Sequence, residues 1–268
     1  MSAMVRLVRA ELLKIRTTRA WWALLIGVAL ATAGFVALQG VIALLGPETT
    51  GAPTGDVQDP ATVRAIYVAG IGTAYLFALA LGVLSSSGEF RHHTITATLL
   101  AAPDRVRVVV AKAVAVAGYG LLYGAAAAVV GIAVGVPFVL GGGGAARLTS
   151  DGVPRSLVLA VLAVALWGLV GLGVGTLIRN QVVALVVTIG VAWIAEPLLA
   201  VGLNALDVGA VARFLPSQAT AALASPAATA NGLTISLLPW WAGALVLLGY
   251  ALAAGALGAV TTLRRDIA

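Results

Sequence analysis

Long runs without a charged residue constrain this chain more than any other feature of its sequence. Four such runs cover residues 20–47, 65–88, 113–146 and 156–178. Each exceeds the roughly 20 residues that a helix needs to cross a bilayer. A charge at the bilayer centre costs about 2.5–3.5 kcal/mol on insertion scales, so such runs mark membrane spans. With two further apolar stretches, the predicted spans cover about 20–45, 65–87, 113–138, 156–178, 181–202 and 239–263.

The composition supports a membrane protein and excludes several classes of function. The chain is 61% hydrophobic and 10% charged, whereas about a quarter of the residues of a soluble domain are charged. Its net charge of +6 is divided among the connections between spans and forms no single basic surface for nucleic acid. Soluble enzymes and nucleic-acid-binding proteins are therefore excluded. The predicted fold class is an all-α membrane protein, with one transmembrane domain over residues 1–268.

The chain has no recognisable nucleotide or metal site. Its two lysines, Lys14 and Lys112, lie outside any G-x-x-x-x-G-K-[ST] loop, the pattern that holds nucleotide phosphates. His92 and His93 have no third ligand nearby in the sequence, and there is no Cys. We therefore expect no catalytic residue, no metal and no cofactor in this chain; if ATP is used, another subunit hydrolyses it.

Lysine and arginine residues are distributed unequally between alternate connections. One side holds Arg6, Arg9, Lys14, Arg16, Arg19, Arg91, Arg105, Arg107, Lys112, Arg179, Arg264 and Arg265. The other side holds only Arg64, Arg147, Arg155 and Arg213. Because basic residues accumulate on the cytoplasmic side of a membrane, we predict that both termini are cytoplasmic.

Residues 1–19 are expected to form an interfacial helix ahead of the first span. Val5, Val8, Leu12 and Ile15 repeat at helical spacing, and basic residues surround this apolar stripe. Such a helix lies on the cytoplasmic leaflet. The alternative is a disordered basic tail that only sets topology, but a tail needs no apolar stripe.

A second helix is expected over residues 86–102, between the second and third spans. Ser86 and Glu89 have the spacing of a capping box, and Pro103 ends the segment. The segment is too polar to enter the bilayer and too apolar to lie free in water. Such a helix needs a partner surface, in the manner of a helix bound in a groove.

The same stretch resembles the signature of bacterial ATP-binding-cassette (ABC) permeases of the type-2 exporter class, E-[F/Y]-R-x-x-T…L…P-x-R…K. The matching residues are Glu89, Phe90, Arg91, Thr94, Leu99, Leu100, Pro103, Arg105 and Lys112. The resemblance implies that 86–102 is a coupling helix that docks in a separate ATPase subunit. It also implies a bacterial cytoplasmic membrane protein, in which two permease chains and two ATPase chains work together and the ATPase holds ATP and Mg²⁺.

The resemblance also implies a role for each matching residue. Glu89 and Arg91 would hold the coupling helix through ion pairs, and Phe90 would anchor it at the membrane. The packed faces would come from Thr94, Leu99 and Leu100. Arg105 and Lys112 would tie the next helix to the membrane surface or to the ATPase. For these two residues and Arg107, plain topology is an equal alternative.

Two rival functions stay open at this point. A secondary carrier would couple to an ion gradient and would need charged residues within its spans, where Glu196 is the exception to an apolar pattern. A membrane anchor for a soluble partner would transport nothing. Both would lack the dependence on an ATPase that the resemblance implies.

Glu196 lies late in the fifth predicted span. An acidic residue within a membrane indicates a functional site, here a gate or a contact in the transport pathway. Alternatively, Pro197 ends the span and leaves Glu196 at the outer interface. The outer segment 203–238 follows; it is expected to be a short helix or a re-entrant lid, or else a surface loop.

Small residues recur four positions apart within the predicted spans. The pairs are Gly120/Gly124, Gly131/Gly135 and Gly171/Gly175. This spacing permits close approach of helices in lipid. With 32 Gly in the chain the spacing also arises by chance, so each pair is only weak evidence for a dimer face.

Overall fold

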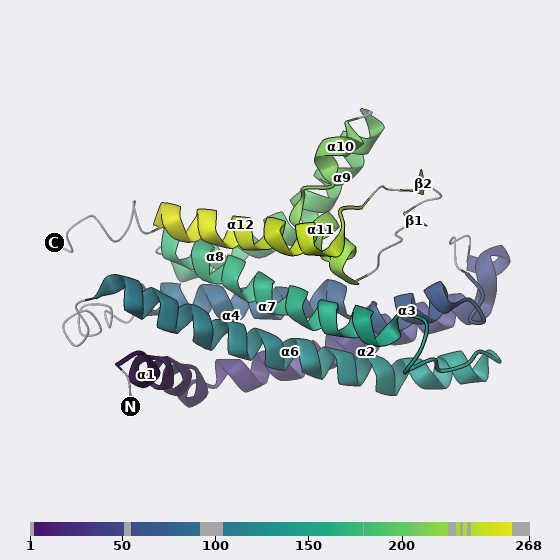
Figure 1. Ribbon diagram of the computed structural model, residues 1–268, viewed down its shortest axis with the longest axis horizontal. Coiled ribbons are helices and arrows are strands. Elements are labelled where there is room, and N and C mark those ends of the chain that lie inside the picture. Colours follow the sequence, from purple (N-terminus) through teal and green to yellow (C-terminus); the bar gives the residue numbers. More distant parts are fainter. Residues whose placement is uncertain are drawn as a thin grey trace.

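A computed structural model describes residues 3–50, 55–91, 104–178, 180–206, 208–224, 229–230, 233–234 and 237–258, and within them the chain is almost entirely helical (Figure 1). The helices are α1 (Ala3–Thr17), α2 (Ala20–Thr50), α3 (Pro60–Val68), α4 (Ile71–Arg91), α6 (Arg105–Gly141), α7 (Val153–Leu177), α8 (Gln181–Gly190), the π-helix η1 (Val191–Ala195), α9 (Glu196–Ala205), α10 (Gly209–Ala212), α11 (Pro216–Ala224) and α12 (Trp240–Gly258). Two short strands, β1 (Thr229–Ala230) and β2 (Leu233–Thr234), pair antiparallel.

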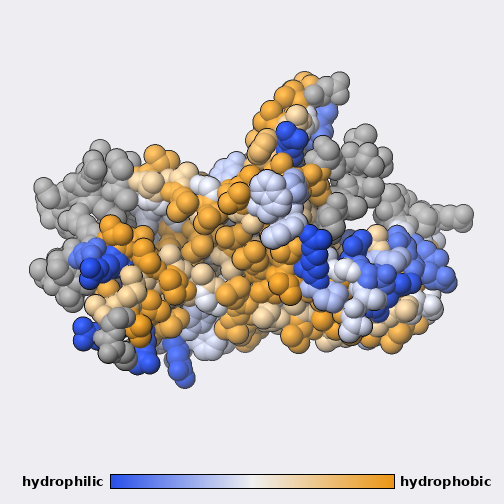
Figure 2. Space-filling model, in the orientation of Figure 1, coloured by the Kyte–Doolittle hydropathy of each residue, from blue (hydrophilic) through white to orange (hydrophobic). Residues whose placement is uncertain are grey.

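Six segments of the described chain are long and apolar enough to cross a membrane, which confirms the predicted all-α fold with six membrane spans. The second segment combines α3 with α4, and the fifth combines α8, η1 and α9. Figure 2 shows an apolar middle with hydrophilic residues gathered at both ends. This distribution matches a bundle whose middle contacts lipid.

The helix bounds differ from the predicted spans mainly at the third helix. α6 begins at Arg105 and continues to Gly141, so Lys112 lies two turns inside it rather than at its start. The charge-free run begins at residue 113, so it did not reveal the earlier turns of α6. A helix can continue beyond the membrane boundary into a segment that contains charged residues. The predicted sixth span reached residue 263, and residues beyond 258 lie outside the described part.

The two ends of the bundle collect alternate connections, as six spans require. α1, the C-terminal end of α4, the N-terminal end of α6 and the C-terminal end of α12 gather at one end (Figure 1). α3 and the connection between α6 and α7 lie at the opposite end. We call these the basic end and the opposite end, following the distribution of Lys and Arg.

The centre of the bundle is α7, which packs against α4, α6 and α12. Glycines permit the closest of these contacts, between α4 and α7. A Cβ at Gly82 would collide with the backbone at Gly168, and one at Gly171 with the carbonyl of Leu79.

The other predicted glycine pairs also serve packing within the chain. Gly120 and Gly124 lie against α7, whereas Gly131 and Gly135 lie against Tyr67 of α3. Gly175, like Gly171, lies against α4. All three spacings therefore have partners in this chain, and none needs a second copy to explain it.

α1 is a helix, and it joins α2 through a tight elbow. The Thr18 hydroxyl donates to the Ile15 carbonyl at 2.8 Å, and the Thr17 hydroxyl donates to the Leu13 carbonyl at 3.0 Å. These bonds satisfy carbonyls that the end of a helix leaves free. α1 packs mainly against α6, so its direction is set by tertiary contacts as well as by the elbow.

Candidate functional site

Ser86 does not cap a helix, which corrects the prediction from the capping-box pattern. It lies inside α4, which continues without a break to Arg91. Its hydroxyl is buried and donates across the bundle to the Leu172 carbonyl of α7 at 3.1 Å. Within a continuous helix the amides already have partners, so the serine hydroxyl acts as a donor to a carbonyl.

The described residues cover only part of the predicted coupling segment. Glu89, Phe90 and Arg91 form the last turn of α4, and Arg105 begins α6. Thr94, Leu99, Leu100 and Pro103 lie outside the described residues, as do His92 and His93. The coupling helix therefore stays a prediction, and it is restricted to residues that follow α4.

Lys112 lies at a buried junction of three helices near the basic end. Its Nζ lies 2.9 Å from Glu11 Oε2 of α1 and donates to the Ser85 carbonyl of α4 at 3.1 Å. Lys112 itself belongs to α6. The ammonium therefore joins α1, α4 and α6, the last two of which flank the predicted coupling segment. We call Glu11, Ser85 and Lys112 the lysine junction.

The lysine junction is well shielded from solvent. Glu11 is 4% and Lys112 is 6% exposed. Lys14 adds a second cation on the outer side, with its Nζ 2.5 Å from Glu11 Oε1. Both oxygens of the carboxylate thus have cationic partners, as a buried charge requires.

Glu11 is a site residue that the sequence analysis missed. The structure buries Glu11 and Ile15 of α1, while Val5 and Leu12 from the predicted stripe are exposed. Glu11 and Ile15 are four residues apart and therefore share a face. An acid on the apolar side of a basic helix was the available signal, but its partner is 101 residues away and only the tertiary structure identifies it.

A second polar cluster lies around Glu196, on the side of the molecule where α9 leaves the bundle (Figure 1). Glu196 is 6% exposed, and its carboxylate accepts the backbone N–H of Ser217. That N–H belongs to the first turn of α11, where amides lack partners within the helix and the dipole favours an anion. Glu196 therefore fixes the start of α11.

Pro197 does not end the fifth helix. The alternative in which the helix stops at Pro197 and leaves Glu196 beyond its end is therefore not favoured. The chain widens into the π-helix η1 and then continues as α9 through Pro197. Proline removes one backbone donor and crowds the preceding turn, and a wider turn accommodates both effects. Glu196 consequently lies within a continuous membrane-length helical segment, Gln181–Ala205.

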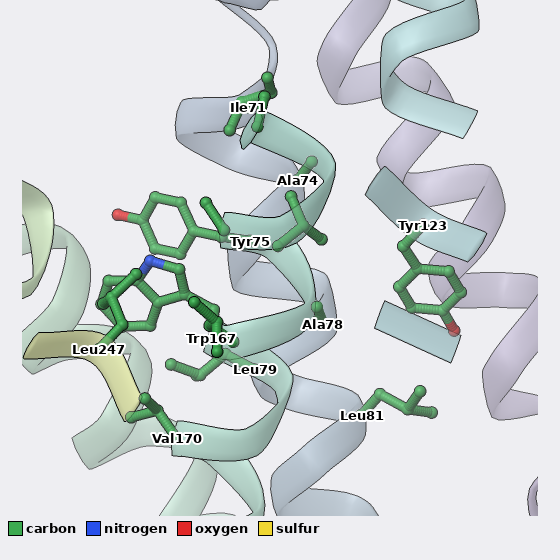
Figure 3. Close-up of a cluster of buried hydrophobic side chains, with 14 of the residues drawn as sticks. Ile71, Ala74, Tyr75, Ala78, Leu79, Leu81, Tyr123, Trp167, Val170 and Leu247 are labelled. Atoms are coloured by element: carbon green, nitrogen blue, oxygen red, sulfur yellow. The ribbon is translucent and has the colours of Figure 1, made fainter. Parts of the chain in front are cut away.

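α11 folds back against α7 and α12, so the outer segment contains a packed helix and is more than a surface loop. The Trp167 indole donates to the Thr220 hydroxyl of α11 at 2.8 Å. Trp167 also stacks on Tyr75, with ring centroids 4.4 Å apart (Figure 3). The Tyr75 hydroxyl donates to the Ala192 carbonyl of η1 at 3.3 Å. This chain of contacts links α4, α7, η1 and α11.

The described residues form a multi-pass helical membrane protein, with a buried ionic junction near the basic end and a buried carboxylate at the start of α9. No group of three His, Cys, Asp or Glu that could hold a metal occurs in the part of the chain that the structure describes.

Comparison with protein families names the class more closely. A family model described as ABC-2 family transporter protein matches residues 7–195, from α1 to the end of η1. The chain therefore belongs to the ABC-2 transporter family, whose members are membrane subunits and generally not catalytic. The match includes the lysine junction and stops just before Glu196. No curated protein matches the chain.

Proposed function

We propose that this chain is the permease subunit of an ATP-driven ABC exporter of the bacterial cytoplasmic membrane. The single observation that carries the proposal is the family match over residues 7–195. ATP and Mg²⁺ are held by a separate ATPase subunit, and the working unit contains two permease chains and two ATPase chains. The basic end faces the cytoplasm, where the ATPase binds.

The coupling segment between α4 and α6 receives the movement of the ATPase. Glu89, Phe90 and Arg91 lead into it from α4, and Arg105 leads out of it into α6. Thr94, Leu99, Leu100 and Pro103 complete it and contribute its packed faces. Docking of this segment in a groove of the ATPase explains an amphipathic stretch between two spans.

The lysine junction supports a route by which this movement reaches the membrane. Because Lys112 joins α4 and α6 to Glu11 of α1, a displacement of the coupling segment moves three helices together. Separation of these helices within the protein interior would leave buried charges without partners, which is costly. Lys112 thus acts inside the permease and not at the ATPase surface.

Glu196 supports a gate at the other end of the pathway. Its carboxylate holds the start of α11, and α11 packs on α7 and α12. Release of this contact would free α11 to move when the spans tilt. An opening between two permease chains would then lead to the external side.

The test is expression of the tagged chain with its neighbouring genes, followed by extraction in mild detergent. We expect an ATPase to co-purify in stoichiometric amount and to hydrolyse ATP. Glu89→Ala and Arg91→Ala should reduce both co-purification and ATP hydrolysis. Arg147→Ala is the matched control, because Arg147 forms an exposed ion pair with Asp151 at the opposite end.

Two outcomes would contradict the proposal. One is a chain that purifies alone and inactive under conditions where a known permease–ATPase pair survives, which would indicate a secondary carrier or a membrane anchor. The other is a bound ATPase whose activity is unchanged by Glu89→Ala and Arg91→Ala in a correctly inserted protein.

A further inference from the structure

A groove of about 660 Å³ opens between α1, the start of α2 and α6, next to the elbow at the basic end. Its polar contributions include Arg9 and Arg16, and its apolar walls include Leu12 and Leu13. None of the described residues that line it is acidic. The groove therefore combines positive charge with apolar surface.

The two arginines lie on one face of α1. They are seven residues apart, which corresponds to two helical turns and about 10 Å along the axis. Both residues are exposed. Guanidinium binds phosphate oxygens in a bidentate manner, so this face suits an anion that carries phosphate.

Aromatic side chains fix the floor of the groove. Trp21 and Tyr119 lie with ring centroids 6.0 Å apart. The Trp21 indole donates to the Arg16 carbonyl at 3.0 Å, and the Trp21 carbonyl accepts the Tyr123 hydroxyl at 2.7 Å. Trp21 is thus held at both its side chain and its backbone, so the groove is preformed before any ligand binds.

The groove lies beside the start of the first membrane-length helix. Trp21 is the second residue of α2, the first membrane-length helix. Tryptophan and tyrosine concentrate at this boundary because one part of the ring is polar and the rest is apolar. Leu13 is 60% exposed beside the arginines, which suits contact with an acyl chain and does not suit a water-soluble ligand.

We propose that this groove binds an anionic phospholipid of the leaflet at the basic end, with its phosphate on Arg9 and Arg16 and its chains along the leucines of α1. Charge complementarity selects the headgroup, since basic pockets between membrane helices bind anionic lipid headgroups. The occupied groove joins α1 to α6 at the elbow. The inference concerns this chain alone and needs no ATPase.

The experiment is native mass spectrometry of the purified full chain with equal amounts of phosphatidylglycerol and phosphatidylcholine. We expect preferential retention of phosphatidylglycerol, and a reduction of about tenfold or more in that preference for Arg9→Gln/Arg16→Gln. Arg6→Gln is the matched control, because Arg6 is an exposed arginine of α1 that does not line the groove. Its preference should equal that of the wild type.

A second measurement does not depend on the arginine variants. Phospholipids with brominated acyl chains should quench Trp21 more strongly when they carry a phosphatidylglycerol headgroup than a phosphatidylcholine headgroup. The Trp21 contribution is the difference between wild type and Trp21→Phe. This quenching measurement keeps the test valid if the Arg9→Gln/Arg16→Gln variant does not fold.

Three results would overturn the proposal. The first is equal retention and equal quenching by the two lipids. The second is a loss in Arg6→Gln as large as in the double variant, which would indicate general attraction to α1. The third is displacement of phosphatidylglycerol by an equal concentration of glycerol phosphate, which would identify a site for soluble anions.

Discussion

At the scale of single residues, burial of Lys112 is compensated by two described hydrogen-bond partners that are both acceptors. An ammonium has three N–H donors and no acceptor, so its cost of burial falls when carboxylate and carbonyl oxygens surround it. Glu11 and the Ser85 carbonyl supply such oxygens. The charges of Glu11 and Lys112 are therefore mutually dependent.

Removal of one partner from this pair should be more harmful than removal of both. Lys112→Met removes one cationic partner of the buried Glu11 carboxylate and leaves the outer cation Lys14 as its remaining cationic partner among the described residues. Loss of one member of a buried pair costs about 3–5 kcal/mol, so the thermal midpoint in detergent should fall by several degrees. Glu11→Gln with Lys112→Met should recover much of that loss.

The control for this prediction is Arg107→Gln on the same helix. Its ion pair with Asp104 is exposed, with side-chain exposures of 59% and 47%. Exposed pairs are worth about 0–1 kcal/mol, so its thermal midpoint should barely change. Equal losses for Lys112→Met and Arg107→Gln would contradict the importance of the lysine junction.

Glu196 gives a second prediction at this scale. Glu196→Leu removes the acceptor for the Ser217 N–H and leaves a partly buried donor unsatisfied. Such a loss costs about 1–3 kcal/mol, so hydrogen exchange of the α11 amides should accelerate by about tenfold or more. Asn204→Ala is the control, since the described hydrogen bond of Asn204 is a donation to the Ala200 carbonyl within α9 and does not involve α11. Unchanged exchange in Glu196→Leu would show that α11 is held by other contacts.

At the scale of elements, the contact between α4 and α7 depends on small residues. Gly82, Gly168 and Gly171 bring the two backbones close enough to exclude side chains between them. Without a hydrophobic driving force between helices in lipid, such close packing supplies much of the attraction. Ser86 adds a hydrogen bond across the same contact.

A methyl group at this contact should therefore be harmful. Gly171→Ala places a Cβ on the Leu79 carbonyl, which is backbone and cannot move aside easily. Overpacking of this kind costs about 1–3 kcal/mol, and the thermal midpoint should fall accordingly. Gly249→Ala is the control, because, apart from its own helical backbone, no described atom lies within 4 Å of the added Cβ. It should be neutral or stabilise by about 0.5–1 kcal/mol, because Ala favours a helix more than Gly does. A loss as large as that of Gly171→Ala would contradict close packing between α4 and α7 as the cause.

At the scale of the whole molecule, the two ends differ in charge as well as in shape. The end with α1 carries most of the Lys and Arg residues, whereas the middle is apolar (Figure 2). The positive-inside rule predicts that this basic end is retained in the cytoplasm and so orients the bundle. Aromatic residues mark the opposite end, where Arg155 lies over the Trp240 ring at 5.8 Å.

The absence of cysteine from the sequence makes the orientation directly testable. Single cysteines at the exposed positions Gln58 and Ser150 should react with an impermeant maleimide on intact cells. A cysteine at Asp104 should react only after permeabilisation, because the positive-inside distribution puts the basic end in the cytoplasm. The cysteine-free chain gives the background, and the reverse pattern of labelling would invert the proposed topology.

The sequence by itself determined the fold class, the number of spans and the sorting of connections between two ends. These follow from hydropathy and charge, which act on each segment separately and need no knowledge of its neighbours. The motif around Glu89 also identified the family, which the match over residues 7–195 confirms. The stripe of α1 predicted a helix, and a helix is present.

Only the tertiary structure decided which polar groups meet. Ser86 was expected to cap a helix but bonds to α7, since a local pattern cannot show that the helix continues through it. Glu11 pairs with Lys112, and Glu196 with the start of α11, across long separations in sequence. Buried charges must find partners wherever the fold provides them, and that choice depends on how helices pack in three dimensions.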